Sequence, residues 1–280
     1  MNTHLIATVI FGLAAPLCWG SEDFSGGLAS RRAYVGSVVL ANYTVGLVLL
    51  VVLALIWHEP FPAPTDVLWG GLAGLAGMLG LLAFYSALSR GKMGIAAPVS
   101  AVLTAALPVL FGMFTAGLPT PLQLGGFALA LPAIGLIVGP QQSEGSPQGI
   151  VLAVLAGCGF GCFFILISRV QPTSTFWSLA TARLLSMGVL LPMVRWQRKP
   201  LLPGMAIAPL VVFAGVLDAL GNTFFVFAAH SGRLDVAAIL SSLYPAATVG
   251  LSALVLRERV IRIQAIGILL VLLAIPLISA

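Results

Sequence analysis

Long apolar runs separated by short polar or charged breaks dominate this chain. No Asp, Glu, Lys or Arg occurs within residues 33–57, 67–89, 93–143, 145–168 or 236–256. A helix needs about 20 apolar residues to cross the hydrocarbon core of a bilayer, so 93–143 must hold two crossings. The runs are too long for the alternating strands of a membrane barrel. The pattern predicts an all-α, polytopic membrane protein.

Glycine, proline and charged residues divide the runs into ten predicted transmembrane helices. Their approximate ranges are 4–28, 34–57, 67–89, 94–116, 121–139, 147–168, 174–194, 206–230, 235–256 and 260–279. The connections are too short for a soluble domain. Pro245, beside Tyr244 in the ninth span, is the best candidate for a functional kink, because proline has no N–H for the helical hydrogen bond.

The second half of the sequence repeats the first at a constant shift of 141 residues. Gly20 falls on Gly161, Phe84 falls on Phe225, and the segment from Pro121 overlays the segment from Arg262. Each half holds five spans, an odd number, so the second half enters the membrane inverted. We therefore predict two five-helix units, 1–141 and 142–280. Inverted repeats are typical of secondary transporters, whose substrate site lies near the midplane between the halves.

Several segments resemble those of a known family. These are "CWGSEDFSGGLASRR", "GIAAPVSAVLTAALPVLFG", "PTPLQLGG" and "AAILSSLYPAATVGLSALVLRERV". Together they are similar to the ten-helix EamA-type transporters of the drug/metabolite transporter superfamily, and the similarity covers essentially the whole chain. It implies an exporter or exchanger of small metabolites, amino acids or amphipathic drugs in the bacterial inner membrane. Members usually carry Gly-Glu where this chain has Arg257-Glu258, so we assign Glu258 only a cap or loop role.

Composition agrees with a membrane protein and argues against other partners. Sixty per cent of the 280 residues are hydrophobic and 8 % are charged, against roughly 45–50 % and 25 % in soluble domains. The 13 Lys and Arg exceed the 8 Asp and Glu, but they fall in short clusters between apolar runs, as in loops beside lipid headgroups. We predict no nucleic-acid partner. Three cysteines in apolar context predict neither a disulfide nor a metal site.

Charged side chains at membrane depth are expensive, so each is a candidate for function. Four qualify, and polar or aromatic neighbours join them. The predicted substrate-binding or coupling residues are Trp19, Glu22, Asp23, Asn42, Arg183, Asp218, Asn222 and Tyr244. A carboxyl group in a cavity can exchange a proton for substrate, so protons are a candidate partner besides the small molecule and the lipid bilayer.

Two questions about these residues stay open at the level of sequence. Arg183 and Asp218 are either a structural ion pair or a substrate-binding pair. Asn42 superposes on Arg183 under the repeat, which favours a shared cavity. Asp23 shares a helix face with Trp19, an arrangement suited to cationic or amphipathic ligands. The alternative for Glu22 and Asp23 is a frayed, water-exposed end of the first span.

Two other classes of function compete with a transporter. An intramembrane enzyme would need a nucleophile with a base, or clustered metal ligands, and no such constellation is visible, so we predict no enzyme and no cofactor. A channel or a non-transporting receptor is the other alternative, although rings of repeated charge are absent from the sequence. One chain already contains both halves of a cavity, so a monomer suffices and a dimer remains open.

The loops carry an uneven share of positive charge. After odd-numbered spans lie Arg31, Arg32, Arg90, Lys92, Arg195, Arg198, Lys199, Arg257, Arg259 and Arg262. The other side has Arg169 and Arg233. The positive-inside rule puts the first group in the cytoplasm and both termini outside, whereas the resemblance implies termini inside.

A reporter fused after Ala280 tests this orientation. With the terminus outside, a fluorescent protein that matures only in the cytoplasm should stay dark, and a phosphatase active only in the periplasm should work. A bright fluorescent fusion with an inactive phosphatase fusion would reverse the orientation.

Overall fold

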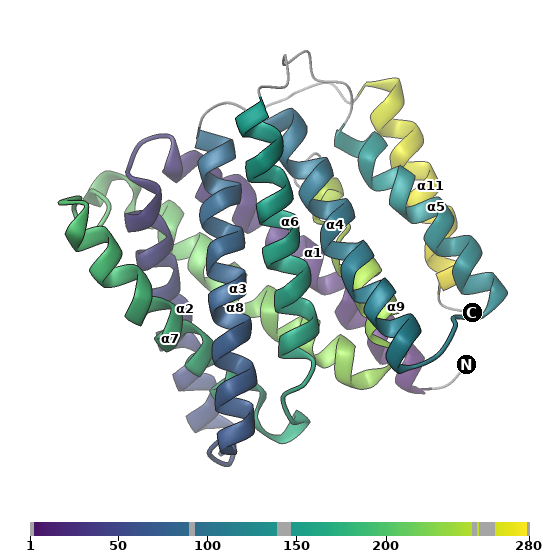
Figure 1. Ribbon diagram of the computed structural model, residues 1–280, viewed down its shortest axis with the longest axis horizontal. Coiled ribbons are helices and arrows are strands. Elements are labelled where there is room, and N and C mark those ends of the chain that lie inside the picture. Colours follow the sequence, from purple (N-terminus) through teal and green to yellow (C-terminus); the bar gives the residue numbers. More distant parts are fainter. Residues whose placement is uncertain (1–2, 90–92, 139–146, 248–250, 252–260, 279–280) are drawn as a thin grey trace.

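The chain is a bundle of helices throughout the part that the structure describes (Figure 1). The computed structural model describes residues 3–89, 93–138, 147–247, 251 and 261–278, and no strand occurs within these ranges. The elements are α1 (Thr3–Ser30), α2 (Val35–Ile56), α3 (Pro64–Ser89), α4 (Met93–Thr115), α5 (Pro121–Val138), α6 (Pro147–Ile167), η1 (Pro172–Ser174), α7 (Thr175–Trp196), η2 (Met205–Ile207), α8 (Ala208–Ser231), α9 (Leu234–Ser241) and α11 (Arg262–Ile278). Among these residues, six helices are long and apolar enough to cross a membrane. The predicted all-α, polytopic class is confirmed.

The observed helices follow the first eight predicted spans closely, but the ninth span is interrupted. Helix α9 ends at Ser241, and the chain turns at Ser242 and Leu243 before helical structure resumes. Pro245 explains the break, because it has no N–H to donate to the carbonyl of Ser241. The predicted kink is therefore a full interruption of the helix. Glu258 lies outside the described residues, and its role stays a prediction.

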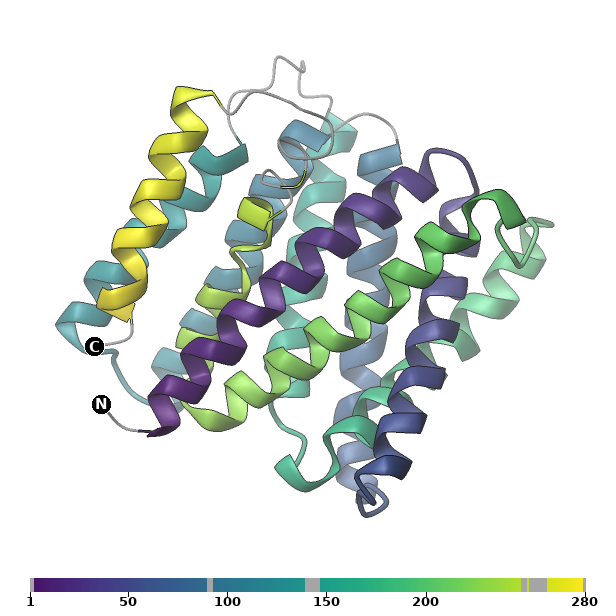
Figure 2. The same cartoon turned by 180° about the vertical axis from the view of Figure 1, so that it is seen from behind.

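Helix pairing repeats between the two halves of the chain. Helix α1 packs along α8, as the view from behind shows (Figure 2), and α3 packs along α6 in the same way. Helices α2 and α7 pack on each other, as do α5 and α11. Exchanging the first five helices for the last five turns the α1–α8 pairing into the α3–α6 pairing and returns the α2–α7 and α5–α11 pairings to themselves. A two-fold relation between the halves would give this pattern. The two five-helix units, 1–141 and 142–280, stay a prediction.

Helices α2 and α7 end in the same way. The second residue after each helix end lies in the left-handed region, His58 with φ of 51° and Arg198 with φ of 54°. The next backbone N–H, from Glu59 or Lys199, donates to the carbonyl five residues back. This bonding satisfies carbonyls that the last helical turn leaves free. The two ends are thus structural counterparts.

This matched geometry corrects the sequence alignment by one residue. Helix α2 spans Val35–Ile56 and α7 spans Thr175–Trp196, a shift of 140 rather than 141. The predicted superposition of Asn42 on Arg183 is therefore wrong, and the counterpart of Arg183 is Tyr43. The shift changes because the connections before and after α7 differ in length from those around α2.

Two acids fasten the first half to the segment around the start of α7: Glu59 in the α2–α3 connection and Asp66 in the first turn of α3. The carboxylate of Glu59 accepts hydrogen bonds from the backbone N–H groups of Phe176 (2.9 Å) and Trp177 (3.2 Å). Burial raises the pKa of Glu59, and these N–H groups oppose the rise. The buried carboxylate of Asp66 accepts from the backbone N–H of Gln171 (3.1 Å) and from the hydroxyl of Ser174 (3.2 Å). These bonds satisfy donors at a helix start that would otherwise lie unpaired.

The opposite end of the bundle has its own fastening. The hydroxyl of Tyr34 donates to the side-chain carbonyl of Gln197, and the hydroxyl of Ser37 donates to the backbone carbonyl of Pro200. Here the connection after α1 is tied to the connection after α7. Each end of the bundle thus has a polar link between the first and second halves.

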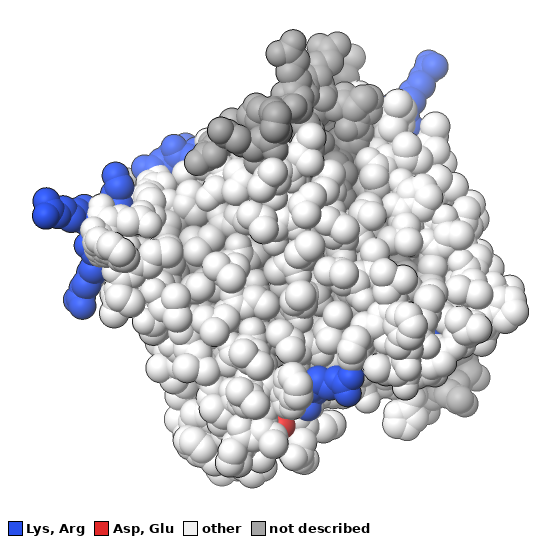
Figure 3. Space-filling model, in the orientation of Figure 1, with Lys and Arg blue, Asp and Glu red and all other residues white. Residues whose placement is uncertain are grey.

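The start of α1 and the end of α11 lie at one end of the bundle (Figure 1). The end that carries the starts of α2, α8 and α11 is therefore the opposite one, and basic side chains project from its rim (Figure 3). The uneven distribution of charge in the sequence is thus an uneven distribution between the two ends of the molecule. Which end faces the cytoplasm stays a prediction.

Replacing Asp66 with Ala should destabilise the fold. The backbone N–H of Gln171 and the hydroxyl of Ser174 would lose their acceptor inside the protein, at a cost of roughly 1–3 kcal/mol. Thermal unfolding of the purified protein in detergent measures the loss. Ser174→Ala is the matched control, because it removes one of the two bonds and should cost less. Equal stability of Asp66→Ala and wild type would contradict this assignment.

Candidate functional site

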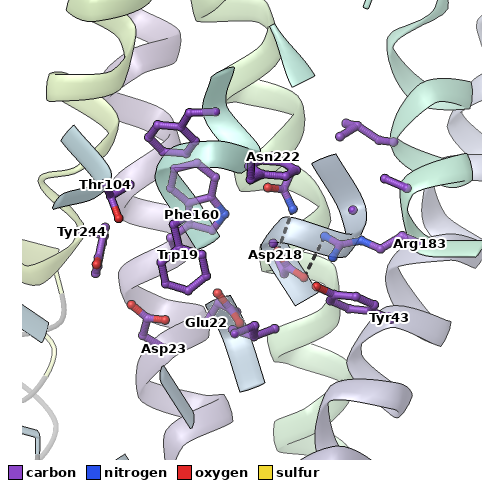
Figure 4. A pocket seen from close by; sticks show the side chains of 17 residues that line it. Trp19, Glu22, Asp23, Tyr43, Thr104, Phe160, Arg183, Asp218, Asn222 and Tyr244 are labelled. Carbon is purple, nitrogen blue, oxygen red and sulfur yellow. Dashed lines mark hydrogen bonds and ion pairs between the residues drawn. The ribbon is translucent and has the colours of Figure 1, made fainter. Parts of the chain in front are cut away.

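A cavity lies at the centre of the bundle, enclosed by helices from both halves (Figure 4). About 640 Å³ in and around it, open solvent included, is not filled by protein atoms. Its lining residues are Trp19, Glu22, Asp23, Tyr43, Gly74, Gly77, Leu81, Thr104, Phe160, Phe163, Phe164, Leu179, Ala182, Arg183, Asp218, Asn222 and Tyr244.

The structure brings seven of the eight predicted site residues to this cavity. These are Trp19, Glu22, Asp23, Arg183, Asp218, Asn222 and Tyr244. Asn42 is absent from the lining, but its side-chain N–H group lies 3.5 Å from a carboxylate oxygen of Glu22. The interpretation of Glu22 and Asp23 as a frayed, water-exposed end does not fit, since both are buried within α1.

Arg183 is neutralised by a neighbouring helix. Its guanidinium lies 2.8 Å from a carboxylate oxygen of Asp218, and the side-chain amide of Asn222 donates to the other oxygen at 2.7 Å. The guanidinium also lies over the ring of Tyr43, 4.2 Å from its centre. A buried ion pair needs such additional partners to offset the loss of water. The Arg183 charge is therefore already balanced within the protein.

Glu22 is held by two neighbours. The hydroxyl of Tyr85 donates a hydrogen bond to its carboxylate, and Asn42 approaches the same oxygen. Tyr85 is fully buried and comes from α3, so this contact ties α1 to α3.

Asp23 has no such partner. The residue is 7 % exposed and lines the cavity. No hydrogen bond or ion pair reaches it from any residue whose position the structure describes, and Figure 4 shows its carboxylate pointing into the space near Tyr244. A buried carboxylate without a partner costs free energy, which a bound cation or proton would recover.

The acidic and aromatic sides of the cavity occupy equivalent positions in the two halves. At the shift of 141, three positions of α1 correspond to three of α6, and all six line the cavity: Trp19, Glu22 and Asp23 in α1; Phe160, Phe163 and Phe164 in α6. Likewise Asp218 and Asn222 of α8 correspond to Gly77 and Leu81 of α3. We call Glu22, Asp23, Asp218 and Asn222 the polar wall, and Phe160, Phe163 and Phe164 the aromatic wall.

Aromatic contacts connect the aromatic wall to α1 and α8, the two helices that carry the polar wall. Trp19 stacks on Phe164 with ring centres 5.4 Å apart, and Phe164 stacks on Phe225 at 3.9 Å. Together these rings make a rigid apolar surface beside the carboxylates. Three acids and one arginine face the cavity, so it carries excess negative charge when the acids are ionised. A cation with an apolar body suits such a site.

Some lining residues are not among those predicted from the sequence. Tyr43 is the counterpart of Arg183 at the shift of 140. Thr104 interrupts the apolar fourth span and is a polar signal for the site. The aromatic wall had no signal, because phenylalanine is common in any membrane span. Among the described residues, no group of three His, Cys, Asp or Glu side chains could hold a metal ion.

The fold and the central cavity define a class: polytopic, all-helical membrane proteins with related halves around an internal site. Residues 147–280 match the model of the EamA-like transporter family, which belongs to the drug/metabolite transporter superfamily. The predicted resemblance is therefore confirmed for the second half of the chain. The match suggests a membrane transporter of the drug/metabolite type.

Two further similarities bear on the fold. A crystal structure superposes with a TM-score of 0.72 and 17 % sequence identity, covering 96 % of this chain and 95 % of that one. An uncharacterized protein of Methanocaldococcus jannaschii is 37 % identical over 68 residues, which are 24 % of this chain and 50 % of that protein. The chain spans about half the length of this curated relative.

Breaking the ion pair from one side should destabilise the protein more than removing both charges. Arg183→Met leaves Asp218 buried without its cation, at an expected cost of about 3–5 kcal/mol. The double variant Arg183→Met/Asp218→Leu should recover much of the loss, because no unpaired charge remains. Thermal unfolding in detergent compares the single variants with the double variant. A double variant less stable than Arg183→Met would contradict this prediction, because it would show that Asp218 stabilises the protein even without Arg183.

Proposed function

We propose that this protein is a secondary transporter that carries small amphipathic organic cations across the bacterial inner membrane in exchange for protons, most simply as an exporter. The observation that carries the proposal is the unpaired carboxylate of Asp23 beside Trp19 and the aromatic wall. The cation of the substrate would sit at Asp23, and its apolar body would lie against the phenylalanine rings. Binding would then satisfy a charge that the empty cavity leaves unpaired.

The charge balance favours a cation over an anion. Arg183, the cationic side chain of the cavity lining, is already paired with Asp218, whose other carboxylate oxygen accepts a hydrogen bond from Asn222. An anionic substrate would have to displace Asp218 and would meet Glu22 and Asp23 nearby. The ion pair is thus better suited to hold α7 against α8 than to bind the substrate.

Exchange for protons follows from the competition for one carboxylate. A proton and an organic cation both neutralise Asp23, so the group binds one or the other. Glu22 lies next to it and is held by Tyr85 and Asn42, and it can take the second proton. A carrier that returns only with one or the other ligand bound exchanges them across the membrane.

The repeated packing of the two halves supports alternating access. The halves are joined at both ends of the bundle by polar links, at Asp66 and at Tyr34. Rocking of one half against the other would open the cavity to one side and close it to the other. One chain contains both halves, so a monomer suffices for this cycle.

Proton movement in proteoliposomes tests the proposal. The purified protein is reconstituted with an internal pH dye and challenged with an aromatic amine, a quaternary ammonium ion and amino acids. An organic cation should drive proton movement with the wild type, and Asp23→Asn should lower the rate roughly tenfold or more. Glu22→Gln reports the contribution of the neighbouring acid.

Glu59→Gln is the matched control. This acid lies outside the cavity, and glutamine keeps an acceptor for the α7 N–H groups. It should transport at the wild-type rate. Cation transport without proton movement would contradict proton coupling but not the proposal that the protein is a carrier. Equal transport by Asp23→Asn and the wild type would contradict the assignment of Asp23 to the substrate site.

A further inference from the structure

Hydroxyl groups gather beside Asp23 on one side of the cavity. Thr104 of α4 and Tyr244, which follows the turn after α9, both line the cavity. Figure 4 shows their oxygen atoms on the same side of the space as the Asp23 carboxylate. The buried hydroxyl of Ser100 lies 3.1 Å from the hydroxyl of Tyr244. We call Ser100, Thr104 and Tyr244 the hydroxyl cluster.

Thr104 offers a hydrogen-bond acceptor to the cavity. Its hydroxyl donates to the backbone carbonyl of Ser100 at 2.7 Å, so its oxygen can meet other groups only through lone pairs. A hydroxyl oxygen has two lone pairs. The neighbouring Tyr244 hydroxyl takes up at most one of them, and no other residue that the structure describes donates to Thr104. A donor within the cavity can therefore bond to this oxygen.

A primary ammonium group needs acceptors in several directions. Its three N–H groups diverge, and their burial without hydrogen bonds costs free energy. The Asp23 carboxylate can neutralise the charge and accept from part of this set. Thr104 comes from α4 rather than α1 and so approaches a bound cation from a different direction. A quaternary ammonium ion carries the same charge but no N–H, so it gains nothing from the Thr104 oxygen.

The aromatic wall would favour the opposite preference if it held the charge. Aromatic rings attract cations through their faces, and quaternary ammonium ions are typical ligands of aromatic cages. The wall consists of α6 residues, whereas Asp23 belongs to α1 and the hydroxyl cluster belongs to α4 and the segment after α9. A cation at Asp23 would thus lie among oxygen atoms, and the phenylalanine rings would contact the apolar body of the substrate.

We propose that the cavity selects amines that keep N–H groups over quaternary ammonium ions, with Thr104 as a specificity-determining residue. One N–H of the charged amine would donate to Asp23 and another to the Thr104 oxygen. This preference rests on the proposed function, which makes Asp23 the group that binds the cation. It does not depend on the exchange for protons.

Binding of two matched cations to the purified full chain in detergent tests the preference. The probes are phenethylammonium and phenethyltrimethylammonium, which share an apolar body and a charge, and isothermal titration calorimetry measures their dissociation constants. The wild type should bind the primary amine more tightly. Thr104→Val removes the hydroxyl but keeps the shape, so it should weaken binding of the primary amine roughly tenfold. Binding of the trimethylated ion should stay unchanged, which shows that the site is intact.

Thr104→Ser is the matched control, because it keeps the hydroxyl. It should bind the primary amine as the wild type does. An equal loss of both cations in Thr104→Val would overturn the role of Thr104, since a merely structural residue affects the two alike. The comparison on the wild type needs no variant. Equal affinity for the two cations, or tighter binding of the trimethylated ion, would overturn the preference.

Transport in proteoliposomes separates a failure of this preference from a failure of the proposed function. Transport of both cations with equal affinity would leave the protein a carrier and overturn the preference. Preferential binding of the primary amine without transport would support the preference and contradict the proposed function. Binding of neither cation would overturn both.

Discussion

The buried ion pair between Arg183 and Asp218 is the interaction on which the centre of this protein depends. A charge at membrane depth is tolerated only when the protein itself supplies its partner. Here Asp218 and the ring of Tyr43 are the partners of Arg183, and Asn222 donates a hydrogen bond to the Asp218 carboxylate. Because the arginine is satisfied, the remaining acids determine the electrical character of the cavity. The unpaired state of Asp23 follows from this arrangement.

The sequence predicted the helices well, because each crossing of a membrane needs a long apolar run and little else. Seven of the eight residues proposed from the sequence line one cavity. A charged side chain inside an apolar span avoids lipid and therefore faces the interior of the bundle. Prediction from the sequence failed where one residue or one distant contact decides the outcome. The change of shift around α7 hid Tyr43, and the roles of Glu59 and Asp66 depend on donors more than 100 residues away.

The two ends of the bundle are linked by different chemistry. Carboxylates bind backbone N–H groups at the end where α1 starts, whereas neutral hydroxyl groups bind carbonyl oxygens at the other. Bonds to charged groups are stronger than bonds between neutral ones. A motion that separates the halves would therefore meet more resistance at the Glu59 and Asp66 end.

The unlike walls of the cavity have an energetic consequence. Two conformations related by exchanging the roles of the halves have equal energies only if equivalent positions carry equal residues. Here α1 presents Glu22 and Asp23 where α6 presents Phe163 and Phe164. The two halves thus present different side chains to the cavity on similarly placed helices. In the alternating-access cycle that we propose, the empty protein would therefore favour one of its two states, and the rate of transport would differ between the two directions.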